Sequence, residues 1–288
     1  MRVTNLMLHE DMLRSLTANA GALQRIQEQV STGRQLIRPS DDPAHVREAI
    51  RIHDSLASLE QFGRNADTAM RQLDAATAAL GSAGDAVQRA RELAVLGATG
   101  SLSAGDRIIM AAEVQQLQEH LVQMSAARDG ESYVFSGFKT GTPPFASPTS
   151  GYQGDTGAVL VRVAPGTTMQ VNVSGQAAFG SALAALEQLR GQLAAGAQVS
   201  GATITAIDDG LAALGEAQAT VGSRQNRLGQ IQSYLQDNLL SGRQLLSTLE
   251  DVDLPAAITH LSERQLAYEA ALKVSANILQ TSLIDYLR

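Results

Sequence analysis

The chain has 288 residues, of which 44% are hydrophobic and only 3% aromatic, and its net charge of −7 comes from 22 basic and 29 acidic residues. This acidic balance argues against binding nucleic acid through phosphate neutralisation. Without Cys, the chain can form neither disulfides nor thiolate metal sites. Because aromatic side chains fill thick cores, their scarcity beside abundant Ala favours thin layers of closely packed helices and an extended body.

Apolar residues at helical spacing predict a first helix that ends near residue 30. The stripe consists of Leu13, Leu16, Ala20, Leu23, Ile26 and Val30. It stops before Gly33, because Gly readily takes the left-handed conformation that ends a helix. Asp42 is the expected N-cap of the next helix and Pro43 its first residue. An Asp side chain accepts hydrogen bonds from free backbone N–H groups, and Pro loses no helical hydrogen bond at that position.

A strict three-four alternation of apolar residues predicts a long second helix over 44–96. Its clearest positions are Ala66, Ala69, Leu73, Ala76, Leu80, Ala83, Val87, Ala90 and Ala94. Small Ala side chains let neighbouring helices approach closely, and we expect this stripe to be ordinary core. A loop at 97–105 follows. A third helix with Met110, Val114, Leu117, Leu121 and Met124 is then expected to end near Asp129-Gly130.

The pattern changes to short β-type runs between residue 131 and about residue 180. These runs are Tyr133-Val134-Phe135, Val159–Val163 and Met169–Val173, separated by turn-forming residues. The segment is therefore predicted to be a small β-rich insert with its own core.

Helical spacing resumes after the insert and is strong from Ile204 to Leu249. Asp251-Val252-Asp253-Leu254-Pro255 interrupts it with cap and turn residues, and a final helix follows. The two halves of the chain are thus nearly mirror images, and antiparallel pairing would bring the terminal helices side by side. The expected fold is mainly α: an elongated antiparallel helical rod with coiled-coil terminal helices and a small β-rich insert domain.

We expect three domains from this layout. They are a terminal coiled-coil domain formed by 1–35 with 255–288, a helical rod domain formed by 36–130 with 200–254, and a small β-rich outer domain over 131–199.

Residue patterns that carry catalysis or metal binding are missing. The five His are scattered, with no HExxH helix motif and no GxSxG nucleophile motif. The segment 136–141 superficially resembles a phosphate loop but lacks the GxxxxGK[ST] spacing. The Asp pairs at 41–42 and 251/253 stand where helices begin, so capping explains them. We therefore expect no catalytic residue, no cofactor and no metal, and a protein that is not an enzyme.

The terminal helices carry the candidate functional surface. A lone pair of helices has little else to pack against, so its own apolar contacts fall short of the entropy cost of ordering it. Partner subunits would supply the rest, and we expect the ends to be disordered in the monomer and to fold on assembly. The predicted assembly and chaperone interface is Leu13, Leu16, Leu23, Ile26, Val30, Ile258, Leu261, Tyr268, Leu272, Leu279 and Leu283.

Several segments, taken in order, resemble the flagellin superfamily. The run from Ser31-Thr32-Gly33-Arg34 to Asp42-Pro43 is similar to the segment after the family's first terminal helix. Arg91-Glu92-Leu93-Ala94-Val95 is similar to the end of its long N-terminal helix. Val221-Gly222 and Glu250-Asp251-Val252-Asp253 resemble its C-terminal half. The run from Tyr133 through Phe145 and the sequences at both chain ends resemble the hook-associated branch of this superfamily more than flagellin itself.

This resemblance implies a structural subunit of the bacterial flagellum that forms the hook–filament junction and templates filament assembly. It implies the first hook-associated protein and flagellin as partners, self-association in a ring, and an export chaperone at the C-terminal helix, with no nucleic acid and no membrane. The N-terminus lacks a cleavable signal peptide, so we expect secretion through the flagellar type III apparatus. The alternatives are a minor flagellin, a cytoplasmic coiled-coil scaffold and a filament-borne hydrolase, the last disfavoured by the short insert without a ligand cluster.

Overall fold

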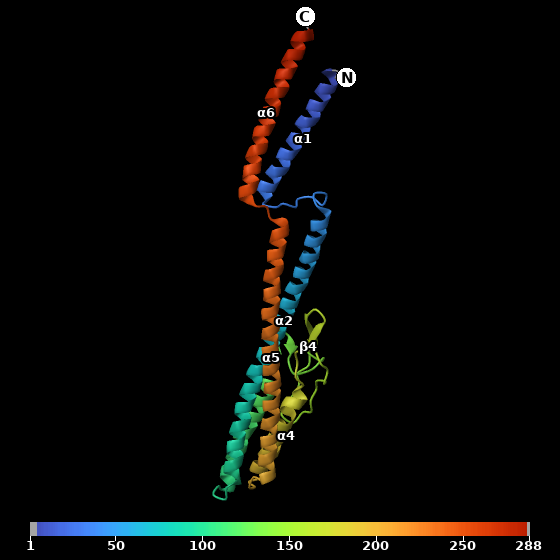
Figure 1. Cartoon of the computed structure of the whole chain (residues 1–288). Coiled ribbons are helices and arrows are strands. Elements are labelled where there is room, and N and C mark those ends of the chain that lie inside the picture. The colour runs from blue at the N-terminus through green and yellow to red at the C-terminus, as the bar shows by residue number, and fades with distance from the viewer. Residues whose placement is uncertain (1–4, 287–288) are drawn as a thin grey trace. The chain divides into compact units, whose positions relative to one another are not determined.

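The computed structural model describes the backbone of residues 5–286 and the side chains of residue 7 and residues 10–276. These described residues contain six helices and four short strands, joined by turns and loops (Figure 1). The predicted mainly α fold class is confirmed. Within the described part of the chain, no helix is long and apolar enough to cross a membrane.

The chain packs into two compact units. Unit 1 comprises Met1–Ala57 with Leu239–Arg288, and unit 2 comprises Ser58–Asn238. Helices α2 (Pro43–Ala98) and α5 (Gly201–Glu250) each contribute residues to both units.

Unit 2 is a bundle in which α2 and α5 run antiparallel. The Nε2 atom of Gln225 donates to Oδ1 of Asp74 at 2.8 Å, and Nε2 of Gln232 donates to Oδ1 of Asp67 at 2.8 Å. The later residue of α5 thus contacts the earlier residue of α2, as antiparallel helices require. The predicted stripe of α2, from Ala66 to Ala94, is no more than 1% exposed at any of its nine positions. The expectation that this stripe is core is confirmed.

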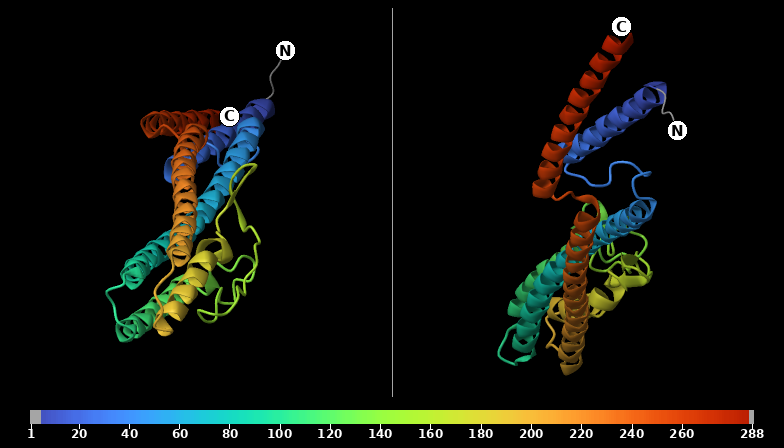
Figure 2. Two further views of the ribbon diagram at one scale, coloured as in Figure 1. Left: turned by 90° about the horizontal axis from the view of Figure 1, so that it is seen from below. Right: turned by 45° about the horizontal axis from the view of Figure 1, so that its top comes forward.

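Helices α3 (Ala104–Ser125) and α4 (Gly175–Ala194) lie against each other in the same unit (Figure 2). Helix α3 begins with a capping box, in which Ser103 Oγ accepts from the Asp106 backbone N–H at 3.1 Å and Asp106 Oδ2 accepts from that of Ser103 at 3.1 Å. Helix α5 approaches α4 closely at Gly210, where a Cβ atom would lie 2.8 Å from the Cα of Ala182.

The third helix is shorter than predicted. It ends at Ser125 rather than near Asp129-Gly130, because the next residues form a hairpin of β1 (Arg128–Asp129) and β2 (Ser132–Tyr133). Gly130 has a φ of 61° and supplies the left-handed turn between these strands.

The insert contains less β-structure than predicted. Strands β3 (Leu160–Ala164) and β4 (Thr167–Gln170) form one antiparallel hairpin, and most of the remaining residues before α4 form turns and irregular backbone. Phe135 from the insert and Phe179 from α4 meet edge to face with ring centroids 5.0 Å apart, and both are fully buried. The insert therefore shares its core with α4, and the division into three domains stays a prediction.

Unit 1 contains the terminal helices α1 (Asn5–Thr32) and α6 (Leu254–Tyr286), which lie side by side (Figure 1). Gly33 follows α1 with a φ of 70°, as the sequence predicts. Asp42 Oδ1 accepts from the backbone N–H groups of Ala44 at 3.0 Å and His45 at 3.1 Å, which confirms the predicted cap at the start of α2. Asp253 caps α6 in the same way through the N–H of Ala256, at 3.2 Å.

Candidate assembly interface

The terminal helices α1 and α6 carry all eleven residues of the predicted interface, and none of the nine with described side chains is buried. Leu13, Ile258 and Leu272 are 55%, 52% and 44% exposed. The half-buried members are Leu16, Leu23, Ile26, Val30, Leu261 and Tyr268. Leu279 and Leu283 belong to α6, but their side chains lie outside the described residues. The described part of the stripe is thus available to a partner.

The contact between α1 and α6 buries few side chains. Among the described side chains of α6 only Ala257 and Ser275 are buried, each 6% exposed, and among those of α1 none is. Small side chains bring two helix backbones close but remove little apolar surface from water. The pair therefore leaves most of its large apolar side chains accessible.

Sequence reasoning missed several exposed apolar residues on these helices. Met7 on α1 is 58% exposed, and Leu266 and Val274 on α6 are 71% and 56% exposed. They lie off the predicted stripe, which follows one row of residues at three-four spacing. Mapping every apolar residue around each helix would have found them. Exposed apolar side chains therefore occur on more than one face of α6.

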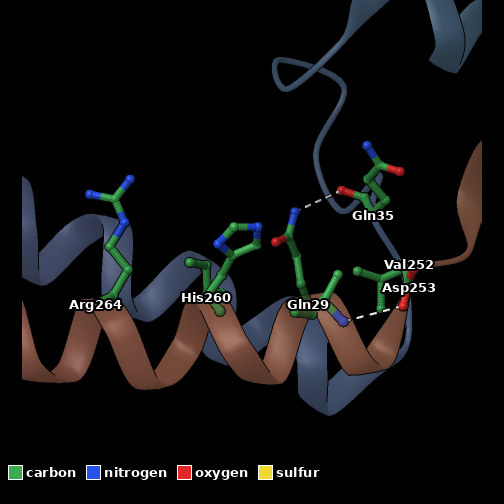
Figure 3. Close-up of a pocket in the computed structure, with 9 residues that line it drawn as sticks. Gln29, Gln35, Val252, Asp253, His260 and Arg264 are labelled. Atoms are coloured by element: carbon green, nitrogen blue, oxygen red, sulfur yellow. Dashed lines mark hydrogen bonds between the residues drawn. The ribbon is translucent and has the colours of Figure 1, made fainter.

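A pocket of about 410 Å³ lies where α1 ends and α6 begins (Figure 3). His260 and Arg264 lie one turn apart on α6 and extend from the same side of that helix, at the edge of the pocket. Nε2 of Gln29 donates to the carbonyl oxygen of Gln35 at 3.2 Å and closes another side. The lining residues are Ile26, Gln29, Gln35, Val252, Asp253, Ala256, Ala257, His260 and Arg264. The lining of the pocket thus combines apolar side chains with the imidazole of His260 and the guanidinium of Arg264.

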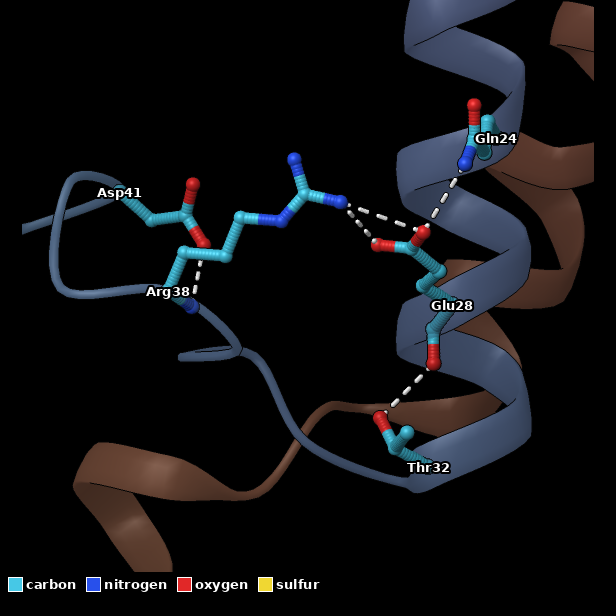
Figure 4. Close-up of polar contacts among 5 residues, drawn as sticks. All are labelled: Gln24, Glu28, Thr32, Arg38 and Asp41. Carbon is cyan, nitrogen blue, oxygen red and sulfur yellow. Dashed lines mark hydrogen bonds and ion pairs between the residues drawn. The ribbon is translucent and has the colours of Figure 1, made fainter.

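Polar contacts tie the segment after α1 back to that helix (Figure 4). Nη2 of Arg38 donates to both carboxylate oxygens of Glu28, at 3.3 and 3.1 Å. The backbone N–H of Arg38 donates to Oδ2 of Asp41 at 2.9 Å. The chain thus turns back along the last turns of α1 before α2 begins.

Asp42 at the start of α2 carries a carboxyl group whose pKa is perturbed. The side-chain hydrogen bond with His45, aided by the backbone N–H groups of His45 and Ala44, holds the pKa of Asp42 below its ordinary value. These contacts belong to a helix cap, not to a catalytic pair. In the part of the chain that the structure describes, no three His, Asp or Glu side chains gather closely enough to hold a metal ion.

Comparison with known protein families matches most of the chain. Residues 3–140 match the model of the bacterial flagellin N-terminal helical region, and residues 204–287 match that of the bacterial flagellin C-terminal helical region. Among curated proteins, the flagellar hook-associated protein 3 of Escherichia coli is 26% identical over 314 aligned residues, which cover 99% of each chain.

Two solved structures from Legionella pneumophila share the fold. One, described as flagellar hook associated protein-3, has a TM-score of 0.63 at 17% identity, covering 69% of this chain and 98% of its own. The other, described as the flagellar junction protein FlgL, has a TM-score of 0.55 at 17% identity, covering 64% and 99%. With both terminal helical regions matched in order around the insert, the chain belongs to the bacterial flagellin family.

Proposed function

We propose that this chain is a structural subunit of the bacterial flagellum that forms the hook–filament junction. The observation that carries the proposal is the exposed apolar surface of α1 and α6, on a chain that aligns along its whole length with a hook-associated protein. Exposed Leu13, Ile258 and Leu272 add little to the stability of a monomer. Burial of the same side chains against neighbouring subunits would stabilise an assembly. Its work is assembly, not catalysis.

The partners follow from this position. The first hook-associated protein lies on one side and flagellin on the other, and copies of the chain associate laterally in a ring whose surface templates the filament. Before assembly, an export chaperone covers α6, and the chain leaves the cell at full length through the flagellar type III apparatus. A secreted product of lower mass, or secretion that persists without that apparatus, would refute this route.

Labelling isolated hook–filament structures tests the location. An antibody against the chain should mark a single band between hook and filament. Marking along the filament would favour a minor flagellin, the runner-up from the same family. Absence from the flagellum would favour a cytoplasmic scaffold. A strain without the chain should release flagellin into the medium as monomers, whereas normal filaments in that strain would overturn the templating role.

A further inference from the structure

The loop formed by residues 33–42, which joins α1 to α2, is loosely packed. Four pockets of about 160 to 430 Å³ have loop residues in their walls. Apart from Pro39, the apolar side chains of the loop are those of Leu36 and Ile37, and both are only half-buried. A side chain that borders an open pocket lacks the dispersion contacts on that side that would fix its position. Apolar packing alone therefore does not determine the path of this loop.

The loop is fastened instead to the end of α5. Arg34 and Asp251 form an isolated antiparallel bridge. The backbone N–H of Gln35 donates to the carbonyl oxygen of Glu250 at 2.6 Å, and that of Val252 donates to the carbonyl oxygen of Gly33 at 2.9 Å. Two short stretches of chain, distant in sequence, are thus held by two backbone hydrogen bonds.

The carboxylate of Glu250 reinforces this connection. Its side chain is only 14% exposed, and one oxygen lies 2.9 Å from Nε2 of His53 on α2. The other oxygen lies 3.9 Å from Nη1 of Arg34 in the loop. Glu250 therefore contacts α2 and the loop with its side chain, and the loop again with its backbone.

The position of Glu250 is unfavourable for α5 itself. It is the last residue of the helix, where the unpaired carbonyl groups already present partial negative charge. A mostly buried carboxylate at that end costs stability unless cationic or hydrogen-bonding partners compensate. Residues that break such a local rule tend to serve contacts elsewhere. Here the compensation comes from His53 and Arg34, on two other segments.

We propose that loop 33–42 is a hinge and that Glu250 is its lock. While the carboxylate holds His53 and Arg34, the loop leaves α5 in a single arrangement, which sets the direction in which α1 departs from the first turns of α2. With the lock open, the two backbone hydrogen bonds to the end of α5 lose this support and open transiently, while the Arg38–Glu28 pair and the Gln29–Gln35 contact hold the loop only to α1. The loop then samples several paths. Terminal helices on such a hinge can meet neighbours of different geometry. The inference concerns the isolated chain and does not depend on the proposed function.

Spin labels can test the lock directly, because the chain has no Cys. In a Ser40→Cys/Ser241→Cys background, both labels occupy exposed positions, one on the loop and one on α5. Double electron–electron resonance should give one narrow distribution of distances between the two labels. Adding Glu250→Ala should broaden it, and the amides of Gln35 and Val252 should lose their protection from hydrogen exchange. Glu250→Gln keeps an oxygen for His53 but loses the charge, so it should give an intermediate width.

Two controls make the outcome decisive. Glu48→Ala removes a carboxylate that pairs with Arg51 within α2 alone, and it should leave the distribution narrow. Unchanged amide protection in α2 and α5, which contribute residues to both units, would show that each variant keeps its fold. If Glu250→Ala unfolds, Glu250→Gln decides. A narrow distribution with protected amides in the folded Glu250 variant would overturn the proposal. So would a broad distribution in the background protein.

Discussion

The bundle of unit 2 and the terminal helices of unit 1 carry the same kind of apolar spacing, yet they use it differently. Leu73 and Leu80 on α2 are no more than 1% exposed, whereas Leu13 on α1 and Leu272 on α6 are 55% and 44% exposed. The difference is the number of helices that surround each stripe: several in unit 2, and one in the terminal pair. Periodicity therefore predicts which face of a helix is apolar, but not whether the same chain covers it.

Limited proteolysis should show the largest contrast between the two regions. Trypsin acting on the dilute monomer should remove much of α1 and α6, because little buried apolar surface resists their opening, and should leave a folded core that contains 58–238. Mass spectrometry of the products would locate the cuts. Equal protection of the terminal helices and the core would contradict the comparison.

Core truncation should separate the regions by free energy of unfolding. Leu121 is fully buried in unit 2, so Leu121→Ala should lower the free energy of unfolding by about 2–5 kcal/mol through lost transfer energy and a cavity. The matched Leu13→Ala on α1 should change it by less than about 0.5 kcal/mol, as at an ordinary surface site. Denaturant titration of both variants would measure this, and equal losses would show that Leu13 is monomer core.

Glycine substitution should give a smaller contrast. Gly210→Ala places a methyl group against the backbone of Ala182 and should destabilise unit 2 by about 1–3 kcal/mol. Gly21→Ala on α1 meets no atom within 4 Å, so it should not destabilise, because Ala favours helix more than Gly does. Thermal melts would compare them. A neutral Gly210→Ala would mean that α4 and α5 can move apart without cost.

Acid should produce the smallest effect, and in both units. A hydrogen bond from Arg190 lowers the pKa of Glu187 in unit 2, and one from His45 lowers that of Asp42 in unit 1. Because both folded-state values are depressed, their stabilising contributions are complete above the unfolded values near pH 4 and are lost as pH falls through the folded values. Glu187→Gln should therefore weaken the loss of stability as pH falls below about 4, followed by circular dichroism. An unchanged acid transition in this variant would show that Glu187 does not contribute to the loss of stability in acid.

Helix ends were predictable where local chemistry decides them, as at Gly33, Asp42 and Pro43. Two helix boundaries were missed. Helix α3 ends early because the residues after it pair as β1 and β2, and α4 begins at Gly175, inside a segment expected to be β-type, although its Ala- and Leu-rich sequence favours a helix. Contacts between residues distant in sequence could not be predicted. The link from His53 to Glu250 spans 197 residues and leaves no signal in local spacing.

The central claim is that the apolar stripe of α6 is an interface and not a core, and Leu272→Asp tests it most directly. The side chain is 44% exposed in the isolated chain, so the melting temperature of the monomer should scarcely change. In the assembled flagellum the same carboxylate would be buried without a partner at every subunit contact, which costs several kcal/mol each. The variant should therefore be soluble and folded but support no filament growth, whereas Leu272→Met, of similar volume, should support it. A lowered melting temperature together with normal filaments would contradict the account.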